Sequence, residues 1–425
     1  MTASQSDVAE LTALAERIFA DVAAFSPDVR GVSRPAYSKV ETRTLDYLAA
    51  LAESHQLRTW RDAGANLVIA GPGDTQPDTA AGYFGSHVDS VPEGGNYDGL
   101  AGVVAALVTL ISLTREGWAP RIPLRVLALR GEESAWYGHA YMGSQALFGK
   151  LGPQALAARR RTGETTLADA MRGIGLPVAD LAEGRPLADP ARFRFFVELH
   201  IEQGPVLVDR GWPVAAVTGI RGNFRHRDIQ CIGEAGHSGA VPRWLRRDAV
   251  FATSELIMRM DDHWSTIQQH GGDLVLTCGI FQTDPAHHAL SRIPGEAHFS
   301  FEARSQHEAT LRAIEGLLHT ECEGIERDRK VRFVFDGIVR APSAELDPGI
   351  LSSILAACKA EGLPAESIPS GAGHDAAIFA EAGVPTGMIF VRNQNGSHNP
   401  DEAMEIQDLM AGVAVMRRLA RELAG

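Results

Sequence analysis

The sequence contains 425 residues, of which 45% are hydrophobic and 22% are charged, and its formal net charge at pH 7 is −13. This length exceeds what one hydrophobic core usually serves, so we expect two domains. The acidic balance argues against a nucleic-acid partner, and no apolar stretch reaches the length of a membrane span, so we expect neither nucleic acid nor membrane as a partner.

The N-terminal segment predicts an amphipathic helix. Apolar residues between Val8 and Val22 recur at helical spacing, and the segment lacks the basic region and continuous apolar run of an export signal. The four cysteines have no CxxC spacing, which argues against a disulfide framework and against a thiolate zinc site. Together these features favour a cytoplasmic protein.

Much of the chain alternates strand patterns with helix patterns. Short apolar runs predict buried strands at residues 81–86, 124–129, 193–199 and 386–391, and longer periodic segments predict helices at residues 99–113 and 408–423. This alternation is typical of an α/β fold built on a mixed, mostly parallel sheet. We expect a catalytic domain made of residues 1–212 and 339–425.

The stretch from residue 213 to residue 338 has a different pattern. Its predicted strands are residues 214–220, 225–232, 274–281, 297–301 and 331–335, and its predicted helices are residues 245–260 and 307–323. This order indicates a smaller α+β domain, ferredoxin-like, with an antiparallel sheet and two helices on one face. Because helix 348–360 resumes the first pattern, the smaller domain is predicted to interrupt the larger one.

Residue types that bind metals or move protons follow four of the predicted strands. In chain order they are His87 and Asp89, Glu132 and Glu133, His200 and Gln203, and His398. A single buried histidine is more often an ordinary core residue than a ligand. Four such clusters at strand ends are hard to attribute to chance, because the carboxyl ends of parallel strands meet at one edge of the sheet.

The chemistry of these side chains indicates a metal site. Imidazole nitrogens and carboxylates without thiolates suit zinc, manganese, cobalt or nickel better than calcium or magnesium. Asp98 lies on a glycine-flanked turn shortly after His87, where a carboxylate could reach back and bridge two cations. A turn-forming aspartate is the alternative.

The adjacent residues Glu132 and Glu133 are expected to have separate roles, since consecutive side chains on an extended segment point to opposite sides. One could bind a metal while the other acts as a general acid and base; a solvated acidic loop is the alternative. Asp89 lies two residues after His87, and its carboxylate could accept the proton of the second imidazole nitrogen and fix the tautomer.

Three further residues are candidates for contacts with a substrate. His237, in a glycine-rich turn of the inserted domain, could stabilise a developing oxyanion, although a structural turn histidine fits the same spacing. Arg304, at the end of a predicted strand, could anchor a carboxylate or form a surface ion pair. His374 precedes a helix in a loop shaped by glycines, which fits either a direct or a structural role.

Taken together, these motifs resemble a known enzyme family. The segments concerned are GSHVDSVPEGGNYDG, EES followed by Gly143-Ser144, ELHIEQGPVL, GHSGAVPRWLRRDA, SGAGHDA and SHNPDE. They are similar to the zinc-dependent N-carbamoyl-L-amino acid hydrolase, allantoate amidohydrolase and β-ureidopropionase family, within the broader group of co-catalytic zinc aminoacylases and carboxypeptidases. The resemblance covers nearly the whole chain from Val32 onward.

The resemblance implies a role for each candidate residue. Two divalent ions, with zinc favoured over manganese, cobalt or nickel, would be held by His87 and His200 on one side, by Glu133 and His398 on the other, and by Asp98 as the bridge. Glu132 would be the general base, and a hydroxide shared by the metals would attack the carbonyl carbon. His237 would come from a lid domain, of the same chain or of the partner in a homodimer, while Gln203 and Arg304 would orient the substrate.

The departures from the family concern the substrate pocket. Trp136 replaces a usual arginine, Ser291 stands where the family has an asparagine that contacts the substrate carboxylate, and the loop at residues 393–398 has an unusual sequence. We therefore expect a metal-dependent amidohydrolase of N-carbamoyl or other N-acyl amino acids. A dipeptidase or aminoacylase is the alternative if Trp136 and Tyr137 enlarge the pocket. A non-catalytic ligand-binding relative is a further alternative, which the presence of Glu132 disfavours.

Overall fold

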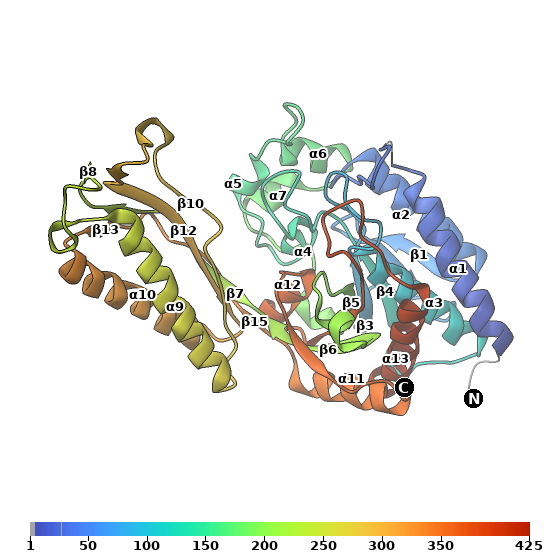
Figure 1. Cartoon of the computed structure of the whole chain (residues 1–425). Coiled ribbons are helices and arrows are strands. Elements are labelled where there is room, and N and C mark those ends of the chain that lie inside the picture. Colours follow the sequence, from blue (N-terminus) through green and yellow to red (C-terminus); the bar gives the residue numbers. More distant parts are fainter. Residues whose placement is uncertain (1–4, 27) are drawn as a thin grey trace. The chain divides into compact units, whose positions relative to one another are not determined.

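The computed structural model describes residues 5–26 and 28–425, and the chain divides into two compact units (Figure 1). The first unit comprises Met1–Thr218 and Glu345–Gly425, and the second comprises Gly219–Ala344. Each unit has a hydrophobic core of its own. Within the described residues, no helix is long and apolar enough to cross a membrane.

The first unit contains one large mixed sheet. Its strand order is β1-β2-β4-β3-β5-β17-β6-β15, and β16 also pairs with β6. The strands are β1 (Arg58–Arg61), β2 (Leu67–Ala70), β3 (Ala81–His87), β4 (Leu124–Leu129), β5 (Phe193–Ile201), β6 (Val214–Ile220), β15 (Ala344–Glu345), β16 (Ser367–Ser370) and β17 (Thr386–Val391). The neighbours β4, β3, β5 and β17 are parallel, which confirms the predicted fold class. Their carboxyl ends therefore meet at one edge.

One strand lies in a different sheet from the one expected. Residues 214–220, which we expected at the start of the inserted domain, form β6, and Val214 pairs antiparallel with Val391 of β17. A short apolar strand has the same pattern in either sheet, so local sequence does not decide which neighbour it takes. The second unit begins only at Gly219, inside β6.

Helices surround this sheet. They are α1 (Gln5–Ala23), α2 (Lys39–Ser54), α3 (Leu100–Arg115), α4 (Met142–Leu147), α5 (Pro153–Leu156), α6 (Leu167–Gly173), α7 (Val178–Ala182), α8 (Val206–Arg210), α11 (Pro348–Ala360), α12 (Asp375–Glu381) and α13 (Ile406–Ala424), with a 3₁₀ turn at Pro190–Arg192. Helix α3 is apolar on all sides and is buried from Leu100 to Leu113, because it packs against β3, β5, α1 and α13. Its N-terminus is thereby fixed beside the ends of the parallel strands.

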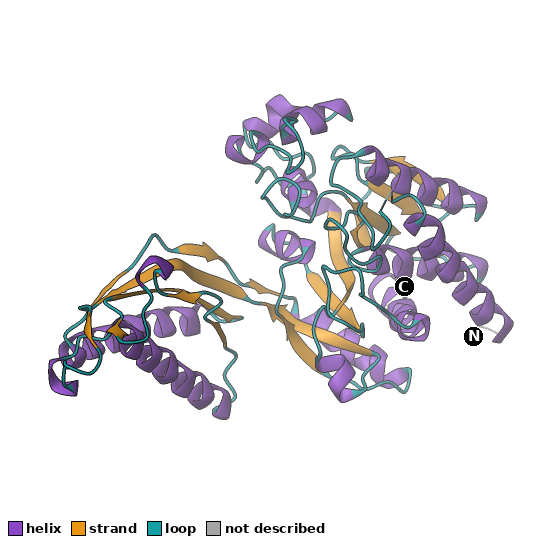
Figure 2. Ribbon diagram, turned by 45° about the horizontal axis from the view of Figure 1, so that its top comes forward, coloured by secondary structure: helices purple, strands orange, loops and turns teal. Residues whose placement is uncertain are grey.

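The second unit has an antiparallel sheet with the order β10-β12-β7-β13, to which β9 and β14 are added. Its elements are β7 (Gly222–Ile232), α9 (Ala249–Gln269), β9 (Val275–Thr277), β10 (Phe281–Gln282), β12 (Glu296–Ser305), α10 (Glu308–Arg329), β13 (Arg332–Val334) and β14 (Val339–Ala341), beside the short pair β8 (Gly236–His237) and β11 (Arg292–Ile293) and 3₁₀ turns at Arg243–Leu245 and Pro285–His287. Alternate residues of β12 are buried under both long helices, which lie along one face of the sheet (Figure 2). This is the predicted α+β arrangement.

Candidate metal centre

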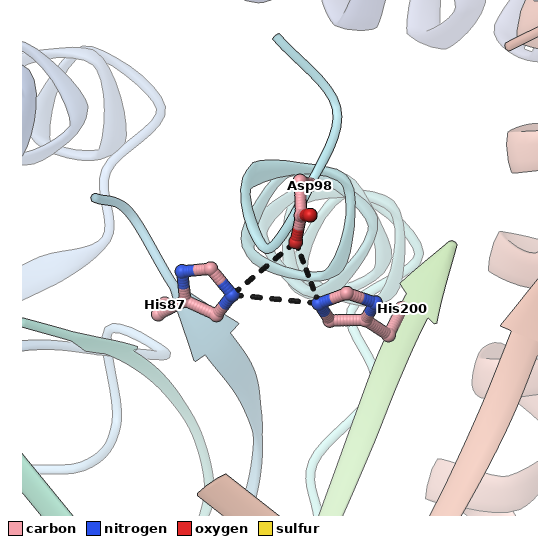
Figure 3. Close-up of side chains that lie close together, drawn as sticks. All are labelled: His87, Asp98 and His200. Atoms are coloured by element: carbon pink, nitrogen blue, oxygen red, sulfur yellow. Dashed lines mark hydrogen bonds and ion pairs between the residues drawn. The ribbon is translucent and has the colours of Figure 1, made fainter. Parts of the chain in front are cut away.

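Three buried side chains meet at the carboxyl ends of β3 and β5. His87 is the last residue of β3, His200 is near the end of the adjacent strand β5, and Asp98 lies just before α3. Figure 3 shows their polar atoms pointing toward one another. The His200 Nε2 is 3.1 Å from Asp98 Oδ1, the His87 Nε2 is 3.6 Å from the same oxygen, and the two nitrogens are 3.4 Å apart. The order of the parallel strands therefore produces the first cluster.

A glycine makes this approach possible. Gly99 has a φ of +66°, and a Cβ atom placed on it would lie 2.3 Å from the Cε1 of His87. Any other residue would be strained in its backbone and would overlap the imidazole ring. Gly99 therefore allows the turn that carries Asp98 to close against His87.

The second oxygen of Asp98 faces a second cluster. The His398 Nε2 is 3.2 Å from Asp98 Oδ2 and 3.3 Å from Glu133 Oε1. Glu133 is buried, whereas the His398 side chain is 52% exposed. Asp98 thus presents one oxygen to two histidines and the other to a histidine and a glutamate.

The spacing of these atoms fits two cations. In a tetrahedral zinc site with ligand bonds of about 2.0–2.1 Å, ligand atoms stand roughly 3.3–3.4 Å apart. The ligand atoms of His87, Asp98 and His200 lie 3.1 to 3.6 Å apart. The His398 Nε2 lies 3.2 Å from Asp98 and 3.3 Å from Glu133, and the oxygens of these two carboxylates lie within 4.8 Å of each other. All donors are nitrogen or oxygen atoms, as zinc, manganese, cobalt and nickel accept. The residues present therefore fit a two-metal site bridged by Asp98.

The charges of the candidate ligands also fit a site for two cations. Burial acts to raise the pKa of Asp98, but hydrogen bonds from His200, His398 and His87 hold this pKa well below its usual value. Hydrogen bonds to Asp98 and Glu133 raise the pKa of His398 to about 11. Asp98 and Glu133 thus favour the protonated form of the imidazoles, and a cation bound between the same groups would have to displace these protons.

Asp89 holds the loop that carries the two glutamates. Its carboxylate accepts hydrogen bonds from the backbone N–H groups of Glu132 at 2.9 Å and Glu133 at 3.0 Å. The Nδ1 of His87 lies 3.1 Å from the backbone oxygen of Asp89 and 3.4 Å from its carboxylate. The main-chain oxygen is therefore the nearer acceptor for this imidazole, whereas we expected the carboxylate.

The two adjacent glutamates turn to different sides. Glu133 approaches His398, while the Oε2 of Glu132 lies 3.9 Å from the Nε2 of His87. Burial raises the pKa of Glu132 well above its usual value, and the nearby charge of Glu133 raises it further. Glu132 is therefore a buried carboxyl group beside, but not within, the two ligand sets.

Two residues that we did not single out, Ser397 and Glu402, also hold the turn that carries Asp98. Glu402 accepts hydrogen bonds from the backbone N–H groups of Tyr97 and Asp98, and the Ser397 hydroxyl lies 2.5 Å from Asp98 Oδ2 and 2.6 Å from Glu402 Oε2. Gln203 donates to Asp98 Oδ2 at 2.7 Å. Both Ser397 and Glu402 lie in the SHNPDE segment, so that motif was the available clue. They tie the turn carrying Asp98 to the loop carrying His398.

His374 lies against the first cluster. Its ring is 4.4 Å from that of His200 in an edge-to-face arrangement, and its Nε2 is 2.9 Å from the Ser370 hydroxyl. Burial keeps the pKa of His374 well below its usual value, so the ring is neutral. Glu198, which we did not single out, is fully buried nearby and accepts a hydrogen bond from the Ser86 hydroxyl at 2.8 Å.

The other three candidate residues belong to the second unit. His237 on β8 pairs with Arg292 of β11, and the Ser238 N–H donates to the backbone oxygen of Ser291, the residue just before β11, at 2.8 Å. Arg304 lies on β12 and forms an ion pair with Glu302 at 3.0 Å. The structure therefore brings His237 and Ser291 together and places Arg304 on another strand.

The two aromatic residues that we considered for the pocket are core residues. Trp136 is 6% exposed and Tyr137 is 5% exposed, and both belong to a buried apolar cluster with Met142 and Leu167. The Trp136 indole N–H donates to the backbone oxygen of Ser90 at 2.7 Å. The expectation that these rings could enlarge a substrate pocket is wrong, because the loop folds them inward.

Comparison with known proteins identifies a family, several relatives in sequence and similar solved structures. The sequence pattern of peptidase family M20/M25/M40 matches residues 74–422. An N-carbamoyl-L-amino acid amidohydrolase of Geobacillus stearothermophilus is 33% identical over 400 residues, which cover 93% of this chain and 94% of the relative. An allantoate amidohydrolase of Escherichia coli is 30% identical over 395 residues, or 93% of each chain. The crystal structure of a hydantoinase/carbamoylase family amidase from Burkholderia ambifaria aligns with a TM-score of 0.84 and 29% identity, over 97% of this chain and 96% of that one.

Proposed function

The chain belongs to peptidase family M20/M25/M40, and from that premise we propose that it is a metal-dependent amidohydrolase that cleaves the C–N bond of an N-carbamoyl or other N-acyl amino acid. The observation that carries the proposal is the division of Asp98 between two ligand sets, with Glu132 buried beside them. The names of the relatives, which are amidohydrolases of N-carbamoyl amino acids and of allantoate, support the choice of substrate class.

His87, His200 and Asp98 would hold one divalent ion, and Asp98, Glu133 and His398 the other. We favour zinc, with manganese, cobalt or nickel as alternatives. When bound, the two ions supply Lewis acidity that polarises the scissile carbonyl group and favours deprotonation of water. Asp89 and Glu402 hold the ligand-bearing loops in position through their hydrogen bonds to backbone N–H groups.

Glu132 moves the proton. It takes a proton from the attacking water and passes it to the leaving nitrogen, which has to leave as a neutral amine. Burial raises the pKa of Glu132 well above that of an exposed carboxyl group, which makes its carboxylate a stronger base. Asp89 fixes the position of this side chain through the Glu132 backbone N–H.

Gln203 is suited to bind an amide or ureido substrate. Its Nε2 donates to Asp98, while its Oε1 is buried and has no hydrogen-bond partner among the described residues. A buried acceptor without a partner is costly, so it is available for an N–H group of the substrate. We assign contacts with the remainder of the substrate to His374, His237, Ser291 and Arg304, with His237 stabilising the developing oxyanion and Arg304 binding the carboxylate.

We further propose that the second unit is a lid that also mediates a homodimer, and that the protein is cytoplasmic. Cysteines 231, 278, 322 and 358 are all free, as a reducing compartment allows. The alternative of a dipeptidase or aminoacylase loses its motivation, because Trp136 and Tyr137 are buried in the core.

The test is a substrate panel. Purified protein, stripped of metal and then loaded with zinc, manganese, cobalt or nickel, is offered N-carbamoyl-L-amino acids, allantoate, N-acetyl-L-amino acids and dipeptides, and amine or ammonia release is measured. We expect the highest kcat/KM on the N-carbamoyl compounds. Preferential cleavage of dipeptides would favour the peptidase, and tight binding without turnover would favour a non-catalytic relative.

A further inference from the structure

Tyr141 has a strained backbone next to the proposed base. Its φ and ψ are 58° and 29°, which is the left-handed region that a residue with a bulky side chain rarely adopts. Such a conformation persists only where the surroundings impose it, and it is concentrated at functional sites. Tyr141 immediately precedes α4 on the loop that begins with Glu132.

Hydrogen bonds hold Tyr141 in this conformation. Its backbone N–H donates to the oxygen of Glu132 at 2.7 Å, and the N–H of Met142 donates to the oxygen of Gly131 at 2.8 Å. The Ser144 hydroxyl, one turn into α4, lies 2.5 Å from Asp375 Oδ1. Tyr141 is therefore tied through its own backbone to Glu132, while α4 is tied to the start of α12.

The phenol group lies over the glycine that precedes His374. A Cβ atom placed on Gly373 would be 1.6 Å from the Tyr141 hydroxyl oxygen, and the φ of Gly373 is not in the left-handed region. A glycine is therefore required at this position for space and not for backbone freedom. The hydroxyl is thus placed between the loop of Glu132 and that of His374, whose ring contacts the metal-ligand candidate His200.

The Tyr141 hydroxyl is a donor without an acceptor. Among the residues that the structure describes, none forms a hydrogen bond with it. Burial raises the pKa of Tyr141, and the charges of Glu132 and Asp375 raise it further, so the phenol keeps its proton. The residue remains partly exposed, so a ligand can approach it.

We propose that Tyr141 is a catalytic residue whose hydroxyl donates a hydrogen bond to the carbonyl oxygen of the group being cleaved. The Tyr141 N–H is hydrogen-bonded to the Glu132 backbone oxygen, and the charge of Glu132 acts on the phenol, so the two side chains lie near each other. A substrate whose scissile bond lies beside Glu132 would therefore present its carbonyl oxygen as the acceptor for this donor. A donor placed there in advance stabilises the negative charge that develops on the oxygen during attack. This inference rests on the proposed amidohydrolase function and adds a residue to it.

The test compares Tyr141→Phe with Tyr137→Phe, both metal-loaded. Tyr137 lies on the same loop but is buried in the apolar core, so it is the matched control. Each variant and the wild type are assayed on an N-carbamoyl-L-amino acid and on its thiocarbonyl analogue, in which sulfur is a weak acceptor. We expect Tyr141→Phe to lose about 10²-fold in kcat/KM and to keep its bound metal and melting temperature. The sulfur penalty, which is the fall in kcat/KM when sulfur replaces the carbonyl oxygen, should be smaller for this variant than for the wild type. Tyr137→Phe should resemble the wild type in each respect.

The proposal is overturned if Tyr141→Phe stays within twofold of the wild type, or if the sulfur penalty is the same in both. If the wild type cleaves only another compound of the panel, the assignment of an N-carbamoyl substrate fails but the role of Tyr141 is still tested. The variants are then compared on that compound and on its thiocarbonyl analogue. If the wild type cleaves nothing, the affinity of an N-carbamoyl amino acid is measured by calorimetry for Glu132→Gln with and without Tyr141→Phe. Equal affinities, or no binding to either, overturn the role of Tyr141.

Discussion

The replacement Gly99→Ala tests whether the turn before α3 assembles the metal centre. Gly99 follows the proposed bridging ligand Asp98, has a φ of +66°, and has no room for a side chain beside His87. The change adds a single methyl group and removes no proposed ligand. Its effect on metal binding therefore reports only on the position of Asp98 relative to His87.

The expected magnitude follows from two contributions. Placing alanine at a φ of 66° and a ψ of −50°, a conformation that L residues rarely adopt, costs about 1–3 kcal/mol of folding free energy, which should lower the melting temperature of the metal-free protein by a few degrees. To reach an ordinary separation of about 3.4 Å from the new Cβ, the His87 ring must also retreat by about 1 Å. Metal sites tolerate deviations of about 0.2 Å in ligand distances. We therefore expect affinity at the His87 and His200 site to fall by at least about 100-fold, the upper end of what loss of an outer-shell contact causes.

The assay is competition with a chelator of known affinity, read as metal bound per chain, with melting curves recorded for the metal-free and loaded forms. Gly71→Ala is the control, because no atom lies within 4 Å of its added Cβ and its φ is not positive. We expect Gly99→Ala to retain one tightly bound ion and Gly71→Ala to retain two. If Gly99→Ala bound two ions with the affinity of the wild type, the proposed assembly of the site by this turn would be refuted.

Three further predictions concern the base, the bridge and the exposed ligand. Glu132→Gln should keep both metals but lose about 10²–10⁴-fold in kcat; undiminished turnover with measured metal content would remove Glu132 as the base. Glu402→Ala frees the backbone N–H of Asp98, and the metal affinity should fall about 10–100-fold, whereas an unchanged dissociation constant would deny this residue a positioning role. In the metal-free protein the pKa of His398 is raised from 6.5 to about 11 by Asp98 and Glu133, so protonated His398 stabilises the fold fully below pH 6.5 and this stabilisation is lost as the pH rises through about 11. The difference in free energy of unfolding between the wild type and His398→Gln should accordingly shrink between pH 6.5 and 11, and a difference independent of pH would contradict the ion pairs.

The arrangement of the ligands could be predicted because it depends on local patterns and one topological rule. The strands that contain His87 and His200, and the strand that ends shortly before Glu133, are short apolar runs buried on both faces, which mark them as parallel. Once they are parallel, their carboxyl ends meet, and the residues after them become neighbours. The fold class and the family resemblance are confirmed, whereas the roles of individual residues remain predictions.

What could not be predicted depends on contacts between distant segments. Glu402 reaches the backbone of Asp98 across more than 300 residues of sequence, and no local pattern indicates that contact. The strand β6 has the same period in either sheet, so its pairing with β17 was not foreseen. Helix α9 begins at Ala249 and not at residue 245, because the Asp248 carboxylate caps it by accepting from the Phe251 N–H at 3.2 Å.

Trp136 shows how a comparison by sequence can mislead about a pocket. Its position next to the proposed catalytic glutamates suggested a contact with substrate. The loop instead turns the indole inward, where it donates to the backbone oxygen of Ser90, so its effect on the site is to support the segment after His87. Tyr141, only five residues further along, is the one whose ring the backbone directs toward Gly373.

The most direct test of a two-metal amidohydrolase is the dependence of turnover on bound metal. Metal-free protein is titrated with zinc, and ammonia release from an N-carbamoyl-L-amino acid is followed as a function of the zinc bound per chain. We predict no turnover without metal and a rise that is complete at two bound ions. Full turnover by the metal-free protein, saturation at one ion, or no turnover at any occupancy would contradict the account.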